Sequence, residues 1–276
     1  MIAPFVDAGW LAEHRCAVVL ADVRWYLDGR SGRAAYEAGH IPDAAYVGLG
    51  EVLSGPPSEG EGRHPFPSPE RFAAGLSRLG ISEHDTVVAY DDAGGAIAAR
   101  LVWMLRILGQ PAAVLDGGLT GWSGTLQTGP PASRPEVRVT PREWPAERMV
   151  GIEEVADTDA VLIDARDASR FAGGPDPVDP RSGHIPGARS LPAAGNLGSG
   201  GRLRGPDELR RRFAEEGIAP PRQVISYCGS GVSACHNLLA LEYAGLPQGR
   251  LYAGSWSQWS RDSKRPVATG PDAPGG

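Results

Sequence analysis

Cysteine, lysine and long apolar runs are scarce in this sequence of 276 residues. Its three cysteines, Cys16, Cys228 and Cys235, show no CxxC spacing, and its six histidines form no HExxH motif, so we expect no metal site and no organic cofactor. No apolar run approaches the roughly 18 residues that a membrane-spanning helix needs. The N-terminus lacks the basic and apolar segments of a secretory signal. We therefore expect a cytoplasmic chain with free thiols and no membrane partner.

Positive charge is also limited. The 27 basic residues, of which only Lys264 is a lysine, are outnumbered by 33 acidic residues, and the net charge is −6. This balance provides no general attraction for nucleic acid. Apolar residues make up 41% of the chain, which is enough for a substantial core and excludes a disordered or fibrous protein.

The sequence repeats itself once. Two pairs of segments recur in the same order: VVLADVR (18–24) matches AVLIDAR (160–166), and TVVAY (86–90) matches QVISY (223–227). One ungapped register places Asp91 opposite Cys228 and Trp122 opposite Trp259. Such self-similarity indicates two homologous domains.

The repeat predicts the domain boundaries and the fold class. We expect a first domain over residues 1–122, a linker rich in Pro, Gly, Ser and Thr over 123–145, and a second domain over 146–276. In each half, short β-branched runs alternate with helical patterns, such as those at 69–80 and 206–218. This order predicts an α/β fold in which each domain has a mainly parallel sheet flanked by helices. Ligands of such sheets bind at the carboxyl ends of the strands.

Cys228 lies at such a strand end. It follows the predicted strand QVISY and precedes a helix that starts near Ala234. The intervening residues form the predicted anion cradle: Gly229, Ser230, Gly231, Val232 and Ser233. The two glycines permit a tight turn whose N–H groups point at one centre, and the helix start adds partial positive charge. These surroundings favour a reactive thiolate, and the hydroxyls of Ser230 and Ser233 could bind that anion or pass a proton. Cys16 and Cys235 are expected to pack in the core.

An anion-binding loop after a cysteine also suits other functions. Cysteine-based phosphatases and arsenate reductases use such a loop, and the phosphatases clamp phosphate with an arginine six positions after the cysteine. Here that position is Ala234, which makes this alternative a minor one. A redox or sulfur-binding module without enzymatic activity is a third alternative.

Several motifs together resemble those of the tandem-domain rhodanese family of sulfurtransferases. They are the paired HIP elements at 40–42 and 184–186, the DAR strand end at 164–166, the loop CGSGVSA at 228–234 and GSWSQW at 254–259. The resemblance extends from about residue 2 to residue 260 and implies two tandem rhodanese-like domains. The loop is similar to that of the 3-mercaptopyruvate sulfurtransferases, with thiosulfate-specific enzymes as the alternative.

The resemblance also implies a mechanism and its residues. A persulfide forms on Cys228 from a small anionic donor, 3-mercaptopyruvate or thiosulfate, and a thiol such as thioredoxin or a small dithiol, or cyanide, removes the outer sulfur. Arg170 and Arg181 bind the donor carboxylate, and His64 relays a proton through Ser230. Any acid that orients His64 is missing or moved to Glu51.

The remaining motif residues are expected to be structural. His40 and His184 recur in both repeats, and Arg166 is expected to form an ion pair. Because Asp91 replaces the cysteine, the first domain should be catalytically inactive.

Overall fold

The computed structural model describes residues 2–58, 60–131 and 134–271. Its contacts divide the chain into two compact units. Unit 1 comprises residues 1–56, 66–145 and 199–203, and unit 2 comprises residues 57–65, 146–198 and 204–276. Each unit therefore contains most of one repeat together with a short segment from the other. The segment 57–65 places residues of the first repeat inside unit 2.

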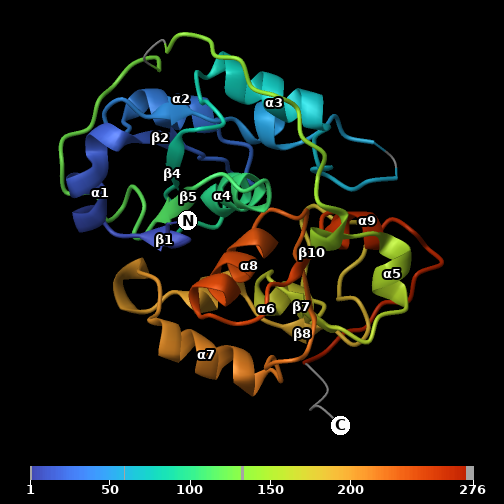
Figure 1. The fold of residues 1–276 in the computed structure, drawn as a ribbon. Coiled ribbons are helices and arrows are strands. Elements are labelled where there is room, and N and C mark those ends of the chain that lie inside the picture. The colour runs from blue at the N-terminus through green and yellow to red at the C-terminus, as the bar shows by residue number, and fades with distance from the viewer. Residues whose placement is uncertain (1, 59, 132–133, 272–276) are drawn as a thin grey trace. The chain divides into compact units, whose positions relative to one another are not determined.

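Unit 1 contains a sheet of five parallel strands in the order β1-β5-β4-β2-β3 (Figure 1). The strands are β1 (Phe5–Val6), β2 (Val18–Asp22), β3 (Ala45–Tyr46), β4 (Thr86–Tyr90) and β5 (Ala112–Leu115). The helices are α1 (Ala8–His14), η1 (Arg15–Ala17), α2 (Gly32–Ala38), η2 (Leu49–Leu53), α3 (Pro69–Arg78), α4 (Ala98–Ile107) and η5 (Ser199–Gly201).

Unit 2 repeats this topology. Its five parallel strands have the order β6-β10-β9-β7-β8, the same arrangement as in unit 1. The strands are β6 (Met149–Val150), β7 (Val161–Asp164), β8 (Arg189–Ser190), β9 (Val224–Tyr227) and β10 (Arg250–Tyr252). The helices are η3 (Ala146–Arg148), α5 (Ile152–Ala156), α6 (Ala168–Phe171), η4 (Ala193–Asn196), α7 (Pro206–Glu215), α8 (Ala234–Tyr243) and α9 (Ser255–Trp259). The expected pair of parallel α/β domains is confirmed.

The predicted strands and helices arise from the local sequence. The central strands β4 and β9 are almost wholly buried, as expected for apolar runs in parallel sheets covered on both faces. Helix α3 starts with Pro69, and the hydroxyl of its N-cap residue, Ser68, accepts a hydrogen bond from the N–H of Arg71. In the described part of the chain, no helix is long and apolar enough to cross a membrane.

The HIP elements directly precede the edge strand of each sheet, β3 in unit 1 and β8 in unit 2. In unit 1 the ring of His40 stacks on Tyr36, and its Nδ1 lies 2.9 Å from the Tyr36 carbonyl oxygen. In unit 2 His184 stacks on Phe171 in the same way, with its Nδ1 2.8 Å from the Phe171 carbonyl oxygen. Both imidazoles are buried, which agrees with the structural role predicted for them.

Candidate active site

Cys228 directly follows β9, at the carboxyl end of the unit 2 sheet. The loop after it turns sharply at Gly231, whose φ is +72°. A Cβ on this glycine would lie only 2.6 Å from the carbonyl oxygen of Ala253, so no other residue fits without rearrangement. Helix α8 then begins at Ala234, as predicted. Only 2% of Cys228 is accessible, so this residue is buried.

Helix α9 fixes the backbone of the cysteine loop. The N–H groups of Trp256 and Ser257 donate to the carbonyl oxygens of Cys228 and Gly229, both at 2.9 Å. The hydroxyl of Ser255 accepts a hydrogen bond from the Cys228 N–H at 3.1 Å. These contacts hold the loop on both sides of the thiol.

Ser255 adopts an unfavourable backbone conformation to make this contact. Its φ is +52°, a region that costs a non-glycine residue on the order of 1–3 kcal/mol. In unit 1 the corresponding position is Gly118, with a φ of +50° and no such strain. In this strained conformation the Ser255 hydroxyl lies within hydrogen-bonding distance of the Cys228 N–H.

Unit 1 shows what the N–H groups of this loop can bind. The carboxylate of Asp91, which corresponds to Cys228, is fully buried and accepts four backbone hydrogen bonds. The donors are Ala93 (2.8 Å), Gly95 (2.7 Å), Ile97 (2.7 Å) and Ala98 (2.9 Å). Burial outweighs these four donors, so the pKa of Asp91 is raised above its usual value, and the donors limit the rise. In unit 1 the loop is therefore a site of converging N–H donors, of the kind that binds anions, and its own side chain fills it.

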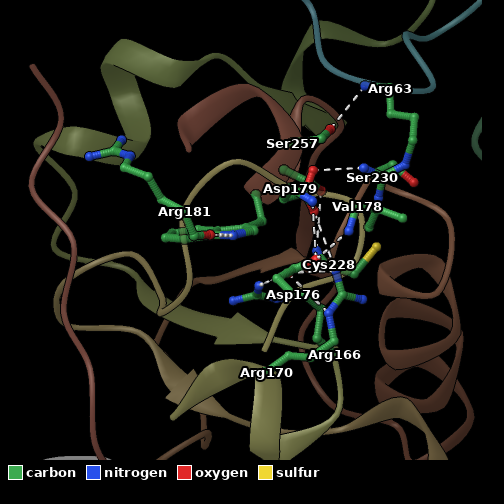
Figure 2. Close-up of polar contacts among 12 residues, drawn as sticks. Arg63, Arg166, Arg170, Asp176, Val178, Asp179, Arg181, Cys228, Ser230 and Ser257 are labelled. Atoms are coloured by element: carbon green, nitrogen blue, oxygen red, sulfur yellow. Dashed lines mark hydrogen bonds and ion pairs between the residues drawn. The ribbon is translucent and has the colours of Figure 1, made fainter. Parts of the chain in front are cut away.

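The segment 57–65 places two side chains beside the cysteine loop. The Nδ1 of His64 lies 2.8 Å from the hydroxyl oxygen of Ser230, so the structure brings together the pair expected to move protons. The backbone N–H of Arg63 donates to the hydroxyl of Ser257 at 2.9 Å (Figure 2). Gly62 permits this approach, because a Cβ there would lie 2.6 Å from the carbonyl oxygen of Gly254.

A cluster of arginines and aspartates lies beside the loop (Figure 2). Arg170, on α6, forms hydrogen bonds to both carboxylate oxygens of Asp176 at 2.8–3.1 Å and to Asp179 at 3.3 Å. Arg63 donates through Nη1 to the other oxygen of Asp179 at 2.6 Å. Asp179 thus joins an arginine of the segment 57–65 to an arginine of α6.

Buried ion pairs support this cluster. Arg166 pairs with Asp164 at 2.6 Å, which agrees with the structural role predicted for it. Burial alone would raise the pKa of Asp176, but the hydrogen bonds from Arg170 and from the Val178 N–H outweigh it and hold the pKa below its usual value. The Asp176 carboxylate is therefore ionised at neutral pH.

Arg181 is not brought to the cysteine. Its guanidinium donates to the carbonyl oxygens of four residues near the end of the chain: Trp259 (2.9 Å), Ser260 (2.7 Å), Asp262 (2.6 Å) and Arg265 (2.8 Å). Figure 2 shows this side chain directed away from Cys228. The expectation that Arg181 and Arg170 bind one donor carboxylate does not fit this geometry, because these hydrogen bonds fix the Arg181 guanidinium at the segment that follows α9.

Two further sequence expectations concern polar groups of the site. Ser233 is the N-cap residue of α8, and its hydroxyl forms no capping hydrogen bond with that helix. The carboxylate of Glu51 forms an ion pair with Arg33 at 3.1 Å within unit 1. Among the described residues, no group of three or more His, Cys, Asp or Glu side chains could hold a metal ion.

Comparison with known proteins agrees with the fold. The family model described as "Rhodanese-like domain" matches residues 7–125 and again 152–262. The chain belongs to the rhodanese family. A relative in Pseudomonas aeruginosa, named "Probable 3-mercaptopyruvate sulfurtransferase", is 41% identical over 92% of this chain and 93% of its own length. A Mycobacterium tuberculosis relative, named "Putative thiosulfate sulfurtransferase", is 39% identical over 92% of this chain and 91% of its own.

Solved structures show the same tandem rhodanese architecture. The 3-mercaptopyruvate sulfurtransferase of Leishmania major superposes with a TM-score of 0.85 at 31% identity, over 96% of this chain and 76% of that one. The Escherichia coli 3-mercaptopyruvate enzyme superposes with a TM-score of 0.79 at 34% identity, over 93% of this chain and all of that one.

Sequence reasoning missed several residues of this rhodanese site. Asp176 and Asp179 carry no signal of their own in a single sequence. Ser255 lies in the GSWSQW motif, but the motif does not show that this serine contacts the cysteine loop. Arg63 does have a signal in the sequence, because it directly precedes His64, which we expected at the cysteine. A segment held at His64 must bring its neighbour to the same place.

Proposed function

We propose that the protein transfers sulfur from 3-mercaptopyruvate to a thiol acceptor, such as thioredoxin or a small dithiol, through a persulfide on Cys228. The protein is a sulfurtransferase of the 3-mercaptopyruvate/thiosulfate type, as its family and its relatives over most of the chain indicate. The loop sequence from Cys228 to Ser233 and the names of three of the four relatives above favour 3-mercaptopyruvate as the donor.

In the proposed first step, the Cys228 thiolate attacks the thiol sulfur of the donor. An S–S bond forms and the C–S bond breaks. The electron pair of the broken bond stays on the carbon fragment as the enolate of pyruvate, which takes up a proton to give pyruvate. His64, acting through Ser230, is the proposed route for that proton. In the second step a thiolate acceptor attacks the outer sulfur and restores the Cys228 thiolate.

The hydrogen bonds to Asp91 are the observation that carries the proposal. The carboxylate oxygens of an aspartate lie two bonds beyond Cβ, and so does the outer sulfur of a cysteine persulfide. In unit 1 the loop N–H groups converge on atoms at that position. If the loop after Cys228 converges in the same way, it stabilises the negative charge of the persulfide as an oxyanion hole stabilises an intermediate.

Mass spectrometry tests the proposal directly. The intact protein is exposed to 3-mercaptopyruvate or to thiosulfate and then to dithiothreitol. We expect a gain of one sulfur atom on the Cys228 peptide, its loss with the dithiol, and no gain in Cys228→Ser. Lack of the adduct with both donors, or an adduct only on Cys16 or Cys235, would contradict the proposal.

Thiosulfate is the second candidate donor, and the name of the M. tuberculosis relative favours it. Steady-state kinetics with both donors separates the two. A larger kcat/KM for thiosulfate than for 3-mercaptopyruvate would reverse the proposed preference.

A further inference from the structure

A hollow beside helix α7 of unit 2 is lined by none of the residues assigned to sulfur transfer. Its volume of about 420 Å³ lies within the range of about 300–1,000 Å³ that is typical of small-molecule pockets. We call it the α7 hollow, and it is lined by Gly195, Arg204, Glu208, Arg211, Arg212 and Glu215. Its three arginines and two glutamates give a net charge of +1, in a chain whose net charge is −6.

The guanidinium group of Arg212 is fixed by neutral hydrogen-bond acceptors. It donates through Nη1 to the side-chain oxygen of Asn196 and through Nη2 to the carbonyl oxygen of Pro192, both at 2.9 Å. The buried side-chain nitrogen of Asn196 lies 3.0 Å from Nδ1 of His236, on α8, and 2.7 Å from the side-chain oxygen of Asn237. A buried polar network therefore holds Arg212 in one orientation, as neighbouring hydrogen bonds do for the side chains of a binding site.

Gly195 provides the surface on which this guanidinium group lies. A Cβ on Gly195 would lie 2.9 Å from Cζ of Arg212, so any side chain here would displace the guanidinium group. Arg204 donates through Nε to the Gly195 carbonyl oxygen at 3.0 Å and through its backbone N–H to the Asn196 carbonyl oxygen at 2.9 Å. Two of the lining arginines are thus anchored on the same short helix, η4.

The positive charge of Arg212 has no carboxylate partner. Within the residues that the structure describes, neither Arg212 nor Arg211 forms an ion pair. Arg204 has a long, exposed ion pair with Glu208 at 3.5 Å, which is a weak one. Burial lowers the pKa of Arg212 and the charge of Arg204 lowers it further, against the opposing effect of two glutamates. An anion in the hollow would stabilise this partly buried guanidinium group.

Arg212 also retains hydrogen-bond donors for a ligand. A guanidinium group has five N–H donors, and the contacts described above use two of those on Arg212. We propose that the α7 hollow binds a phosphate group, held by Arg212 and Arg204 with the exposed Arg211 beside them. Several arginines suit phosphate better than a carboxylate, because phosphate has more acceptor oxygens and a larger charge. The phosphate group belongs either to the free ion or to a small phosphate ester.

An NMR titration of the full chain measures this binding without requiring sulfur transfer. Inorganic phosphate and glycerol 3-phosphate are titrated separately at constant ionic strength, with chloride as the reference anion. We expect a saturable shift of the amide signals of residues 193–196, and the lower Kd identifies the source of the phosphate group. Signals of residues 229–233 report separately any binding at the cysteine loop. If neither compound shifts the signals at 193–196 with a Kd below about 10 mM, the inference is overturned.

Two substitutions on α7 locate the site. Arg212→Gln should raise the Kd about ten- to hundredfold, as expected for the loss of a charged hydrogen-bonding partner. Arg210→Gln is the matched control, because Arg210 bonds to Asp207 and to the Ala244 carbonyl oxygen and does not line the hollow. Its Kd should stay within about twofold of the wild-type value. If Arg212 only anchors η4, Arg212→Gln will lower the melting temperature and leave the Kd unchanged, which overturns the inference.

A charge reversal keeps the test valid if Arg212→Gln does not fold. Arg211 is exposed, so Arg211→Glu should fold as the wild type does and raise the Kd about tenfold by repulsion of the anion. Arg210→Glu makes the same change of charge one residue away, outside the hollow. Equal Kd values in these two variants would show that only the general charge of the surface matters, and would overturn the inference.

Discussion

Replacing Asp91 with asparagine tests whether the loop N–H groups bind an anion. Each carboxylate oxygen of Asp91 accepts two backbone hydrogen bonds. An asparagine amide keeps one oxygen and turns the other into an NH₂ group, which cannot accept a hydrogen bond. Whichever way the amide is oriented, two N–H donors lose their acceptor. At about 1–3 kcal/mol for each unsatisfied buried donor, Asp91→Asn should cost roughly 2–6 kcal/mol.

The neighbouring Asp92 provides a matched control. Its carboxylate is exposed and accepts one hydrogen bond, from the Tyr26 hydroxyl at 2.6 Å. Asp92→Asn retains an acceptor and should change the free energy of unfolding by about 0.5 kcal/mol or less. Urea unfolding measures both variants, and hydrogen exchange of the amides at 93–98 provides a local measurement. Equal stability of the two variants, with unchanged exchange at 93–98, would refute the anion-binding account of the loop.

Three further predictions follow from the unit 2 site. Cys228→Asp introduces the side chain that unit 1 has at this position, so it should abolish sulfur transfer. This variant should nevertheless unfold at a higher temperature than Cys228→Asn. The reverse order of melting temperatures would show that the loop N–H groups of unit 2 do not converge. The pKa of Asp176 is lowered in the folded state, so its ionised form stabilises the fold. This contribution is fully present above about pH 4, the pKa of an aspartate in the unfolded chain, and is lost as the pH falls through the lower pKa of the folded state. Urea unfolding should therefore show a stability gap between the wild type and Asp176→Asn that is constant from about pH 5 to 8 and shrinks in acid; a gap that widens in acid would contradict the assignment. Arg181→Gln removes four hydrogen bonds to backbone carbonyls and should lower the melting temperature without raising the KM for 3-mercaptopyruvate, whereas a raised KM would return Arg181 to the donor site.

The features that the sequence predicted well are encoded locally. The buried strand at 224–227 and the helix from Ala234 follow from apolar runs and glycine spacing, and the repeat supports each assignment twice. The contact between His64 and Ser230 was expected from the family resemblance, and the structure brings the two residues together. The proton relay assigned to them remains a prediction.

The features that sequence reasoning missed depend on contacts between distant segments. Arg181 lies in a motif that suggests substrate binding, but its direction is set by carbonyl groups some 80 residues later in the chain. Arg63 lies in the first repeat, yet its segment belongs to unit 2 and is held there by Ser257 and Asp179. No local sequence pattern predicts either arrangement, because each depends on which groups the tertiary fold brings within hydrogen-bonding distance.

The two repeats use one loop in two ways, and one contact of the loop differs between them: unit 2 has Ser255 where unit 1 has Gly118. In unit 1 the Asp91 carboxylate supplies permanent acceptors for the loop, and the unstrained Gly118 suffices at the next turn. In unit 2 a thiolate ends one bond short of the corresponding position. If the N–H groups of the unit 2 loop converge there as they do in unit 1, the thiolate leaves them without an acceptor until a second sulfur is attached. A loop without such an acceptor depends more on its other contacts. The strained Ser255, whose hydroxyl binds the Cys228 N–H, supplies one of them, which accounts for keeping a serine where glycine would be relaxed.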